Sequence, residues 1–177
     1  LGFRYGNRAV IRDLDLDIRP GEMIGLVGHS GSGKSTLVNL ICRFYDASDG
    51  TIRVDGTDIR RFGVADYRRH IGLVLQEPFL FFGTIAENIA RFGDVDAAQV
   101  VAAADAAGVR SMILRLPEGY GTRVVGHAIS AGQRQLLTIA RAMARPSAVV
   151  ILDEATASVD SLTDKLIDEA MDALFSS

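Results

Sequence analysis

One loop carries the residue types and the spacing that bind phosphate. Residues 28–35 read GHSGSGKS and match the pattern GxxxxGK[ST], between an apolar run and a helical pattern. Glycines let consecutive backbone N–H groups turn toward an anion, and the following helix presents its positive end to the same anion. We expect Lys34 to reach the β- and γ-phosphates of a nucleotide and Ser35 to ligate Mg²⁺. The alternative is an ordinary Gly/Ser-rich turn.

The whole loop is expected to surround the nucleotide. Its expected binding residues are Gly28, His29, Ser30, Gly31, Ser32, Gly33, Lys34, Ser35 and Thr36. Lys34 would also act catalytically, because its charge neutralises phosphate charge. His29 stands at a variable position of the pattern, so we expect it to be a bystander rather than a catalyst.

Two adjacent acids form the second group of chemical residues. Asp153 and Glu154 directly follow the apolar run 149–152. A triphosphate with Mg²⁺ needs carboxylates beyond the edge of the sheet, where Asp153 would bind the metal ion and Glu154 would polarise the attacking water. The alternative is that both acids only solvate the end of a strand. The residues ATASVD that follow them favour the catalytic interpretation.

The strands that would position these residues are predicted from hydropathy. Residues 23–27 and 148–152 are almost continuously apolar, which is typical of central parallel strands covered on both faces by helices. Residues 71–75 are predicted to form another buried strand. Residues 14–18 alternate leucine or isoleucine with aspartate and predict an antiparallel strand with one solvated face. Residues 51–54, followed by Asp55-Gly56, predict a hairpin.

Helices are predicted from apolar residues that recur at helical spacing. The first predicted helix carries Leu37, Leu40, Ile41 and Phe44 on one face. Two more helices are predicted over residues 95–107 and 130–145, and Pro146 ends the second of these. The last predicted helix begins with a Ser161/Asp164 capping box and carries the apolar residues Leu162, Leu166, Ile167, Met171 and Leu174. Residues 78–93 are expected to be irregular with one short helix.

Composition restricts the class of protein. The 177 residues, 48% of them hydrophobic, suffice for one α/β domain. The net charge of -3, with both signs interspersed, argues against nucleic acid as a partner. No apolar run approaches the roughly 20 residues that span a bilayer. Cys42, a lone thiol, is expected to be a small core residue in a reducing cytoplasm. Because the chain starts at Leu1, we expect it to be cut from a longer polypeptide.

The order and spacing of these motifs resemble the nucleotide-binding domain of ABC transporters over almost the whole chain. The resemblance implies an α/β fold, with a P-loop NTPase (RecA-like) core, an antiparallel β subdomain and an α-helical signature subdomain. Residues 1–177 would be a single ATPase domain, truncated at both ends. Residues 1–77 and 146–177 would form the antiparallel part and the core, and residues 78–145 the helical signature subdomain.

Three further segments support the resemblance. Residues 3–6, FRYG, resemble the A-loop, in which Tyr5 would stack on adenine, although a tyrosine in a strand is usually structural. Residues 74–78, VLQEP, resemble the Q-loop, which implies that Gln76 touches Mg²⁺, takes part in catalysis and senses the membrane domain. Residues 79–89, FLFFGTIAENI, match the exporter-type pattern, which points toward an exporter rather than an importer.

The segment 130–133, SAGQ, resembles the signature motif. The resemblance implies that Ser130, Gly132 and Gln133 contact the γ-phosphate held by another subunit, since a helix N-terminus favours an anion. Ser130 is also expected to be the N-cap of that helix. Asp160 would belong to the D-loop, which lies across the same interface. Each site is therefore expected to be complete only when two domains meet head to tail with two-fold symmetry.

The chain departs from the family pattern in three places. Ile129 and Ala131 replace the usual leucine and first glycine of the signature, and both replacements are tolerable. Between Thr122 and Ser130 the chain is shorter than the family spacing and lacks an acid, which puts coupling to transport in doubt. In the family, a further strand and a switch histidine follow the helix that here ends near Phe175, whereas this chain stops at Ser177. We therefore expect the isolated chain to be a weak ATPase and less stable than an intact domain.

The expected function is ATP hydrolysis that drives a membrane exporter, with ATP and Mg²⁺ as cofactors. The expected partners are a second nucleotide-binding domain, in a homo- or heterodimer, and transmembrane domains on the same polypeptide. The expected location is the cytoplasmic face of the inner or plasma membrane. Two alternatives stay open: a non-transporting ABC ATPase that acts on nucleic acid or ribosomes, and a degenerate module that binds ATP without hydrolysing it.

Overall fold

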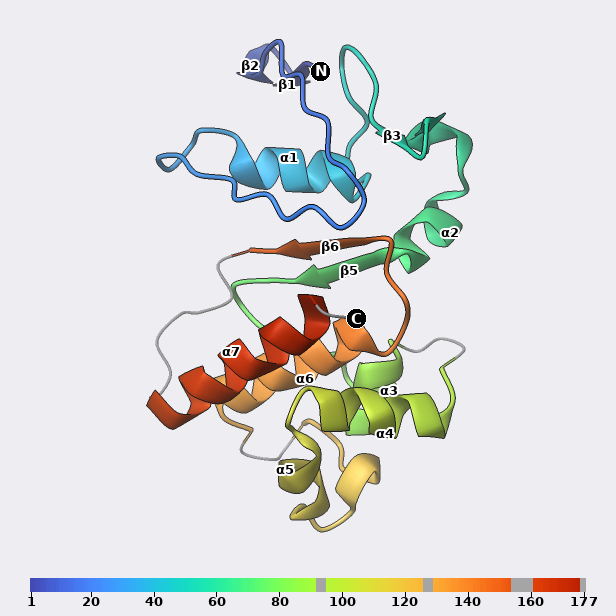
Figure 1. The fold of residues 1–177 in the computed structure, drawn as a ribbon, viewed down its shortest axis with the longest axis vertical. Coiled ribbons are helices and arrows are strands. Elements are labelled where there is room, and N and C mark those ends of the chain that lie inside the picture. Colours follow the sequence, from blue (N-terminus) through green and yellow to red (C-terminus); the bar gives the residue numbers. More distant parts are fainter. Residues whose placement is uncertain (92–94, 126–128, 154–160, 176–177) are drawn as a thin grey trace. The chain divides into compact units, whose positions relative to one another are not determined.

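Two units make up the chain in the computed structural model, Leu1–Arg69 and His70–Ser177 (Figure 1). The structure describes residues 1–91, 95–125, 129–153 and 161–175. The expected grouping of residues 1–77 with 146–177, apart from 78–145, remains a prediction.

The first unit combines short antiparallel strand pairs with helices. Its elements are β1 (Phe3–Tyr5), β2 (Arg8–Ile11), α1 (Lys34–Ile41), β3 (Arg53–Val54), β4 (Thr57–Asp58), the 3₁₀ helix η1 (Ile59–Arg61) and α2 (Val64–Arg69). Strands β1 and β2 pair antiparallel, and so do β3 and β4, in which Val54 lies opposite Thr57. The hairpin around Asp55-Gly56 is therefore confirmed, and its first strand, β3, is shorter than the predicted strand 51–54.

Helix α1 is fixed at its C-terminal end by side chains of α2. The Tyr67 hydroxyl donates to the carbonyl oxygen of Ile41 at 2.8 Å, and Arg68 donates to those of Cys42 and Arg43. These bonds satisfy carbonyl groups that a helix end leaves without an intrahelical partner. Cys42 is buried, as expected. Phe44 is exposed and lies beyond the end of α1, so its predicted place on the buried helix face is wrong.

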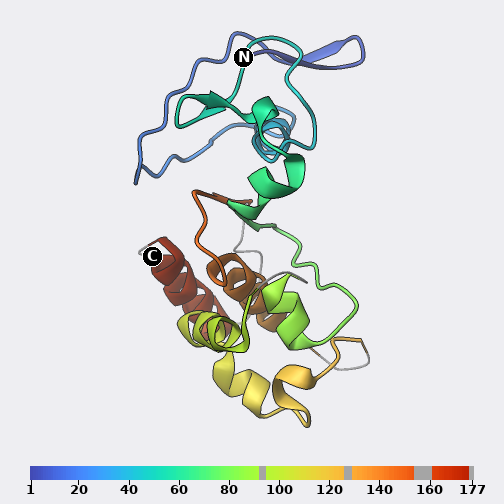
Figure 2. The ribbon, with the colours of Figure 1, turned by 90° about the vertical axis from the view of Figure 1, so that its right-hand side faces the viewer.

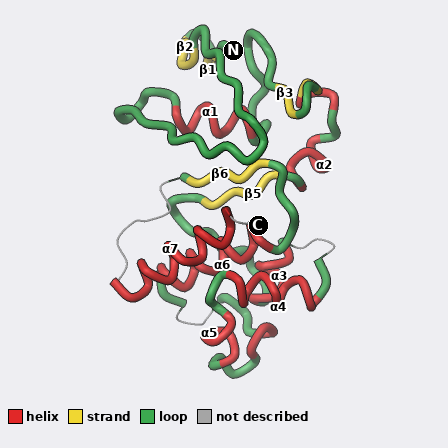
Figure 3. Tube along the Cα trace, viewed as in Figure 1, coloured by secondary structure: helices red, strands yellow, loops and turns green. Residues whose placement is uncertain are grey.

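Two predicted strands of the first unit are wrong. Residues 12–33 form loops and turns between β2 and α1 (Figure 3). In residues 23–27, predicted as a buried parallel strand, Met23 is 73% and Val27 is 96% exposed. A strand needs neighbours that pair with its backbone, and an interior glycine such as Gly25 weakens it. In residues 14–18, Leu16 and Ile18 are also exposed, because no strand pairs with this described segment.

The second unit packs helices against one parallel strand pair. Its elements are β5 (Ile71–Val74), α3 (Ile85–Ala90), α4 (Ala97–Ala106), α5 (Arg110–Leu114), the 3₁₀ helix η2 (Gly119–Gly121), α6 (Ala131–Met143), β6 (Val149–Leu152) and α7 (Ser161–Phe175). Helices α6 and α7 lie side by side on one face of the β5–β6 pair, with α3 and α4 beside them (Figures 1 and 2). The predicted strands 71–75 and 148–152 and the helices near 95–107 and 130–145 are confirmed within a few residues.

The core of the second unit centres on α6. One continuous cluster of buried apolar residues joins this helix to β5, α3, α4, α5 and α7. Leu137, Ile139 and Ala140 of α6 are fully buried, as are Ile85 and Ile89 of α3. Full burial of such side chains contributes about 1.5–3 kcal/mol each. The helix is therefore held in one position relative to the strand pair and to α3.

Three helices of the second unit begin with the same N-terminal capping motif. Thr84, Asp96 and Ser130 are N-caps, and each exchanges two hydrogen bonds with the residue three positions later, in a capping box. For α7, the predicted capping box at Ser161 lies outside the described side chains. Within the described ranges, every helix is too short or too polar to cross a bilayer.

Candidate functional site

The phosphate loop of the first unit connects directly to α1, which begins at Lys34. The Lys34 Nζ donates to the carbonyl oxygens of Gly28 at 2.6 Å and of His29 at 3.2 Å. The ammonium group is thus drawn back over the loop that precedes its own helix. A cation at this point, beside the free N–H groups of the first helical turn, is arranged to attract an anion. The His29 ring lies beside its neighbour Ser30, with its Nδ1 2.9 Å from the Ser30 carbonyl oxygen.

Glycine is required at particular points of this loop. Gly33 is the N-cap of α1 and has φ 98°, a left-handed conformation that other residues adopt only with strain. At Gly28 the reason is space, since a Cβ atom would lie 2.6 Å from the Ser32 Oγ. Ser35 and Thr36 follow in the first turn, with Ser35 exposed and Thr36 buried. The loop is therefore compact, and the first turn of α1 carries one solvent-exposed hydroxyl, that of Ser35.

The predicted residues of the second unit meet at one edge of its strand pair. Val74 is opposite Leu152 at the end of the parallel β5–β6 ladder, and the Asp153 N–H extends the ladder by donating to the Val74 carbonyl oxygen at 2.9 Å. Gln76 and Asp153 therefore leave the sheet at the same edge, its carboxyl end. Gln76 is exposed and Asp153 is half-buried. The carboxyl ends of parallel strands are where α/β sheets bind ligands.

The donor atoms predicted for Mg²⁺ fit a hard cation. A serine hydroxyl, an amide oxygen and a carboxylate are all oxygen ligands, which Mg²⁺ prefers. They come from Ser35 in the first unit and from Gln76 and Asp153 in the second. Among the described residues there is no cluster of three or more histidine, cysteine or acidic side chains that could bind a metal ion by itself. The chemistry of the donors supports the prediction, which otherwise stays untested.

The start of α6 presents backbone N–H groups. The Ser130 Oγ accepts from the Gln133 N–H at 3.2 Å, and the Gln133 Oε1 accepts from the Ser130 N–H at 3.0 Å. The N–H groups of Ala131 and Gly132 precede the intrahelical hydrogen-bond ladder and point out of the helix end. Ser130 is exposed, and Gly132 is buried. The N-cap predicted at Ser130 is confirmed, and the helix end can accept an anion.

Tyr5 belongs to an exposed aromatic group of the first unit. Its ring lies edge-on to Phe3 at a centroid distance of 4.8 Å and edge-on to Tyr45 at 5.3 Å. Tyr5 is 40% exposed, so part of one ring is accessible for stacking. Sequence reasoning did not single out Tyr45, which follows α1 after three residues and gave no spacing signal. The structure therefore adds Tyr45 to the neighbourhood of the predicted adenine contact.

Two of the predicted site residues lie outside the described residues. These are Glu154, the predicted polarising base, and Asp160, the predicted D-loop residue. Residues 126–128, within the shortened loop, also lie outside them. The roles assigned to these residues remain predictions.

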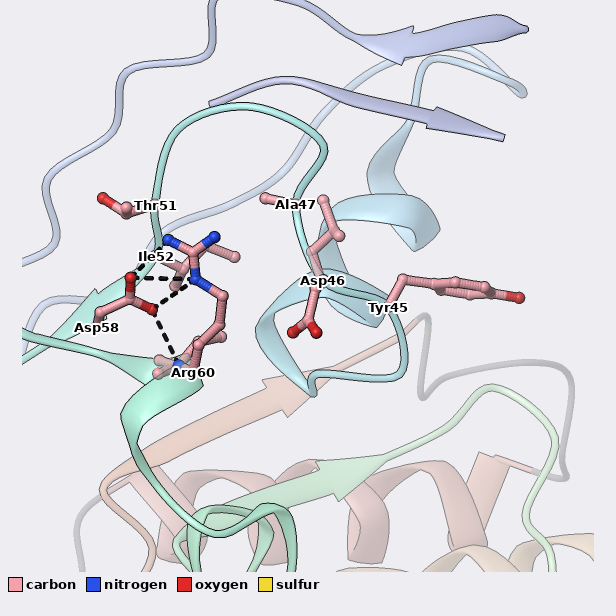
Figure 4. Close-up of a pocket in the computed structure, with 9 residues that line it drawn as sticks. Tyr45, Asp46, Ala47, Thr51, Ile52, Asp58 and Arg60 are labelled. Atoms are coloured by element: carbon pink, nitrogen blue, oxygen red, sulfur yellow. Dashed lines mark hydrogen bonds and ion pairs between the residues drawn. The ribbon is translucent and has the colours of Figure 1, made fainter. Parts of the chain in front are cut away.

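A small pocket of the first unit is lined by Tyr45, the neighbour of Tyr5, and by none of the residues predicted for the nucleotide site (Figure 4). Asp58 and Arg60 face each other there, with an Arg60 Nη2 to Asp58 Oδ2 distance of 2.6 Å. The Arg60 side chain and N–H, both hydrogen-bonded to Asp58, lower the pKa of that carboxyl to about 2. The same pair closes the N-terminus of η1, where Asp58 is the N-cap. The pocket is therefore part of a local structural element, and we assign it no ligand.

Sequence reasoning missed a pair of residues, Arg141 and Asn88, that joins α6 to α3. The Arg141 Nε donates to the Asn88 carbonyl oxygen at 2.8 Å, and its Nη2 donates to the Asn88 Oδ1 at 2.9 Å. Asn88 is fully buried. A polar residue within an apolar helical pattern was the available signal at both positions, because buried polar groups must be hydrogen-bonded.

Comparison with known proteins shows which family has this sequence and fold. A family model described as ABC transporter matches residues 11–157 of the chain. The chain belongs to the ABC transporter family. Its fold class is accordingly confirmed as the α/β fold of the ABC ATPase domain, a P-loop NTPase.

Curated relatives of this ABC domain are transport proteins. "ABC multidrug transporter MDR2" of Trichophyton interdigitale (strain MR816) is 46% identical over 179 residues, which cover 97% of this chain and 13% of the relative. "Uncharacterized ABC transporter ATP-binding protein YknV" of Bacillus subtilis (strain 168) is 47% identical over 171 residues, which cover 94% of this chain and 28% of the relative. The chain is accordingly an ATPase domain of the ABC family.

A solved structure agrees with these relatives. "Structure of a bacterial Atm1-family ABC exporter with ATP bound" superposes with a TM-score of 0.86 and 37% sequence identity. The match covers 98% of this chain and 31% of that chain. The ABC domain thus spans less than a third of each of the three proteins compared, and the remainder of those proteins has no counterpart in it.

Proposed function

We propose that this ABC domain binds Mg·ATP at its phosphate loop and hydrolyses it to drive an exporter. The observation that carries the proposal is the loop 28–35, which folds its lysine back over its own carbonyl groups immediately before α1. The similar solved structure, which is that of an ABC exporter, supports the direction of transport. The substrate that is exported would be determined by parts of the protein outside this domain.

Each residue of the phosphate loop has a distinct task in this proposal. The loop N–H groups and the positive end of α1 hold the phosphates, and Lys34 neutralises the charge that develops on the outer two. The hydroxyl of Ser35, the amide of Gln76 and the carboxylate of Asp153 would hold Mg²⁺, which supplies positive charge between the β- and γ-phosphates. Tyr5, with Tyr45 beside it, offers a ring face to adenine.

Hydrolysis also needs a base and a second source of phosphate contacts. Glu154 would accept a proton from the attacking water while Gln76 orients that water. The free N–H groups at the start of α6, next to Ser130, would contact the γ-phosphate bound to another copy of the domain. Two ATP molecules would then lie between two domains arranged head to tail, with Asp160 of each domain at the interface.

The domain would work at the cytoplasmic face of a membrane, attached to transmembrane domains of the same polypeptide. The relatives support this, because the exporters among them are far longer than the matched region. Hydrolysis would separate the two ATPase domains and reset the membrane part. Neither nucleic acid nor ribosomes are proposed as partners.

The proposal is tested by Glu154→Gln in the polypeptide that carries this domain. We expect hydrolysis to fall at least about 100-fold, because the water loses its base, and an ATP-bound dimer to accumulate in size-exclusion chromatography. Glu169→Gln is the matched control, since Glu169 lies on the exposed side of α7 and pairs with the exposed Lys165. Unchanged hydrolysis without a trapped dimer would contradict the role of Glu154. ATP binding without hydrolysis in the unmodified protein would favour a regulatory module.

A further inference from the structure

A half-buried arginine in α6 connects three separate segments of the second unit. Arg141 donates from Nε and Nη2 to the backbone and side chain of Asn88 in α3, and from Nη1 to the carbonyl oxygen of Phe79 at 2.9 Å. Its guanidinium carbon also lies 5.0 Å from the centroid of the Phe81 ring. These partners are separated from Arg141 by 53 and 62 positions in the sequence. One side chain therefore fixes the segment after β5 and helix α3 against α6.

Asn88 completes the connection from the other side. Its Oδ1 accepts from the Phe81 N–H at 2.8 Å, and its Nδ2 donates to the carbonyl oxygens of Phe81 at 3.0 Å and Thr84 at 2.9 Å. With Arg141 also bound to it, the buried amide has all its polar atoms satisfied. Fully satisfied buried networks are rigid and specify one arrangement. The backbone from Phe79 to Thr84 is thus held by two side chains that contact each other.

The charge of Arg141 is held at a cost in free energy. Burial, together with the smaller effect of the nearby charge of Arg91, lowers the pKa of its guanidinium to about 10. The group is still charged near neutral pH, and the acceptors of its three hydrogen bonds are neutral oxygens. An apolar side chain could pack between α3 and α6 without this desolvation penalty. The arginine instead fixes the orientation of the segments that it joins, because its planar guanidinium binds three acceptors at once in a fixed geometry.

The two ends of this connection lead to predicted nucleotide contacts. The segment held by Arg141 follows Gln76 by three residues, and Gln76 leaves β5 at the edge that also carries Asp153. Helix α6, which carries Arg141 in its last turns, begins at the Ser130 N-cap. Because a packed helix of 13 residues moves as one piece, a contact near its end also restrains its beginning. The connection therefore joins the neighbourhood of Gln76 to the neighbourhood of Ser130.

We propose that Arg141, together with Asn88, is a positioning residue that makes the segment after Gln76 and the helix that begins at Ser130 move as one body during ATP hydrolysis. The proposal rests on the proposed function, since it assumes that Gln76 and Ser130 contact Mg·ATP. Arg141 itself touches neither the nucleotide nor the metal ion. Its loss affects the turnover step, which requires Gln76 at the domain's own ATP and Ser130 at the ATP of the other copy to be placed together, and leaves binding at the phosphate loop intact.

The test is Arg141→Lys in the polypeptide that carries this domain, with kcat and KM for Mg·ATP measured separately. Lysine keeps the charge but loses the planar fork. We expect kcat to fall about tenfold, equivalent to about 1.4 kcal/mol of transition-state stabilisation, and KM to stay within about twofold. Arg110→Lys is the matched control, because Arg110 is exposed and pairs with Asp105, an exposed residue of α4. The control is expected to keep the kcat of the unmodified protein.

A second variant protects the test against a failure to fold. Phe81→Leu removes the ring beside the guanidinium at a partly exposed position and leaves the backbone hydrogen bonds in place. We expect a fall of kcat of about threefold at unchanged KM, because cation–π contacts of this kind contribute about 0.5–1 kcal/mol. In the double variant Arg141→Lys with Phe81→Leu, kcat should be no lower than in Arg141→Lys alone, since both changes act on one contact.

The outcomes separate this inference from the proposed function. If the unmodified protein does not hydrolyse ATP, the proposed function fails. If it does, and folded Arg141→Lys keeps its kcat within twofold, the positioning role is wrong. The same conclusion follows if Arg141→Lys lowers only the melting temperature, or if Arg141→Lys does not fold and Phe81→Leu leaves kcat unchanged. A rise in KM at constant kcat would also overturn it, because that result places the effect in nucleotide binding.

Discussion

Val74 lies opposite Leu152 at the last register position of the parallel β5–β6 ladder. Two chain segments that are far apart in sequence therefore leave the sheet at one edge, and each carries a predicted magnesium contact, Gln76 or Asp153. A carboxylate and an amide oxygen at such an edge suit a hard divalent cation.

Asp153→Asn should weaken the binding of Mg²⁺. The variant keeps the size of the side chain and loses its negative charge, so we expect the Mg²⁺ concentration for half-maximal ATP hydrolysis to rise about 100-fold, the order reported by changes around metal ligands. ATP binding in EDTA should not change. Asp168→Asn on the exposed face of α7 is the control. Equal Mg²⁺ titrations for the two variants would remove Asp153 from the metal site.

Ser130 has two separable roles, as an N-cap and as a neighbour of the phosphate. Ser130→Ala removes the cap and should destabilise the domain by about 1 kcal/mol. Ser130→Asp keeps a capping oxygen but brings negative charge to the helix end, so it should preserve stability and lower ATP hydrolysis at least about tenfold. Melting temperatures and kcat, measured on the same preparations, distinguish the two effects.

Thr84 provides the control for Ser130, because it forms the same capping box with Glu87 at the start of α3. Thr84→Asp should keep both stability and hydrolysis. If Ser130→Asp behaves in the same way as Thr84→Asp, the start of α6 does not contact phosphate.

Gly28 is restricted by space, and this restriction can be relieved. Gly28→Ala would place a Cβ atom 2.6 Å from the Ser32 Oγ, so either the Ser32 side chain or the loop backbone must shift. We expect a loss of about 1–2 kcal/mol in the free energy of unfolding and weaker ATP binding by calorimetry. Gly28→Ala with Ser32→Ala removes the closest atom and should recover part of both losses. No recovery in the double variant would show that the serine hydroxyl is not the obstacle.

Tyr67 makes the stability of the first unit depend on alkaline pH. Burial raises the pKa of its hydroxyl to about 12, and that hydroxyl donates to the Ile41 carbonyl oxygen. The folded state therefore holds its proton more tightly than the unfolded state. The stabilisation is complete below pH 10, the ordinary tyrosine value, and is lost as pH rises toward about 12.

Tyr67→Phe cannot ionise and provides the reference for this effect. The difference in free energy of unfolding between the unmodified chain and Tyr67→Phe should shrink by about 1–2 kcal/mol from pH 9 to pH 11.5 in urea titrations. A difference that stays constant over this range would mean that the pKa of Tyr67 is not raised.

Local signals in the sequence predicted part of this molecule correctly. The Ser130 cap and the Asp55-Gly56 turn depend on neighbouring residues, and the structure confirms them. The apolar runs 71–75 and 148–152 also form strands, because each finds the other as its parallel partner. Residues 23–27 were predicted as a strand from their apolar run alone. That prediction failed because a strand depends on partners that hydropathy does not specify.

The polar character of Arg141 and Asn88 is visible in the sequence, but their contact with each other is not, for a related reason. An arginine within an amphipathic helix is normally assigned to the solvent-facing side, and its partners here are 53 and 62 positions away. Only the packing of α3 against α6 brings the guanidinium beside Asn88 and Phe79. The phosphate loop is the opposite case, since all the groups that act there lie within nine consecutive residues, Gly28 to Thr36.

The two lysines of the chain allow the most direct test of the central claim that the phosphate loop binds and activates ATP. Lys34 lies over the loop, whereas Lys165 is exposed on α7 and pairs with Glu169. In the polypeptide that carries this domain, Lys34→Ala should lower kcat/KM for Mg·ATP at least about 100-fold. Lys165→Ala should leave it within twofold. Equal kcat/KM for the two variants would contradict the account.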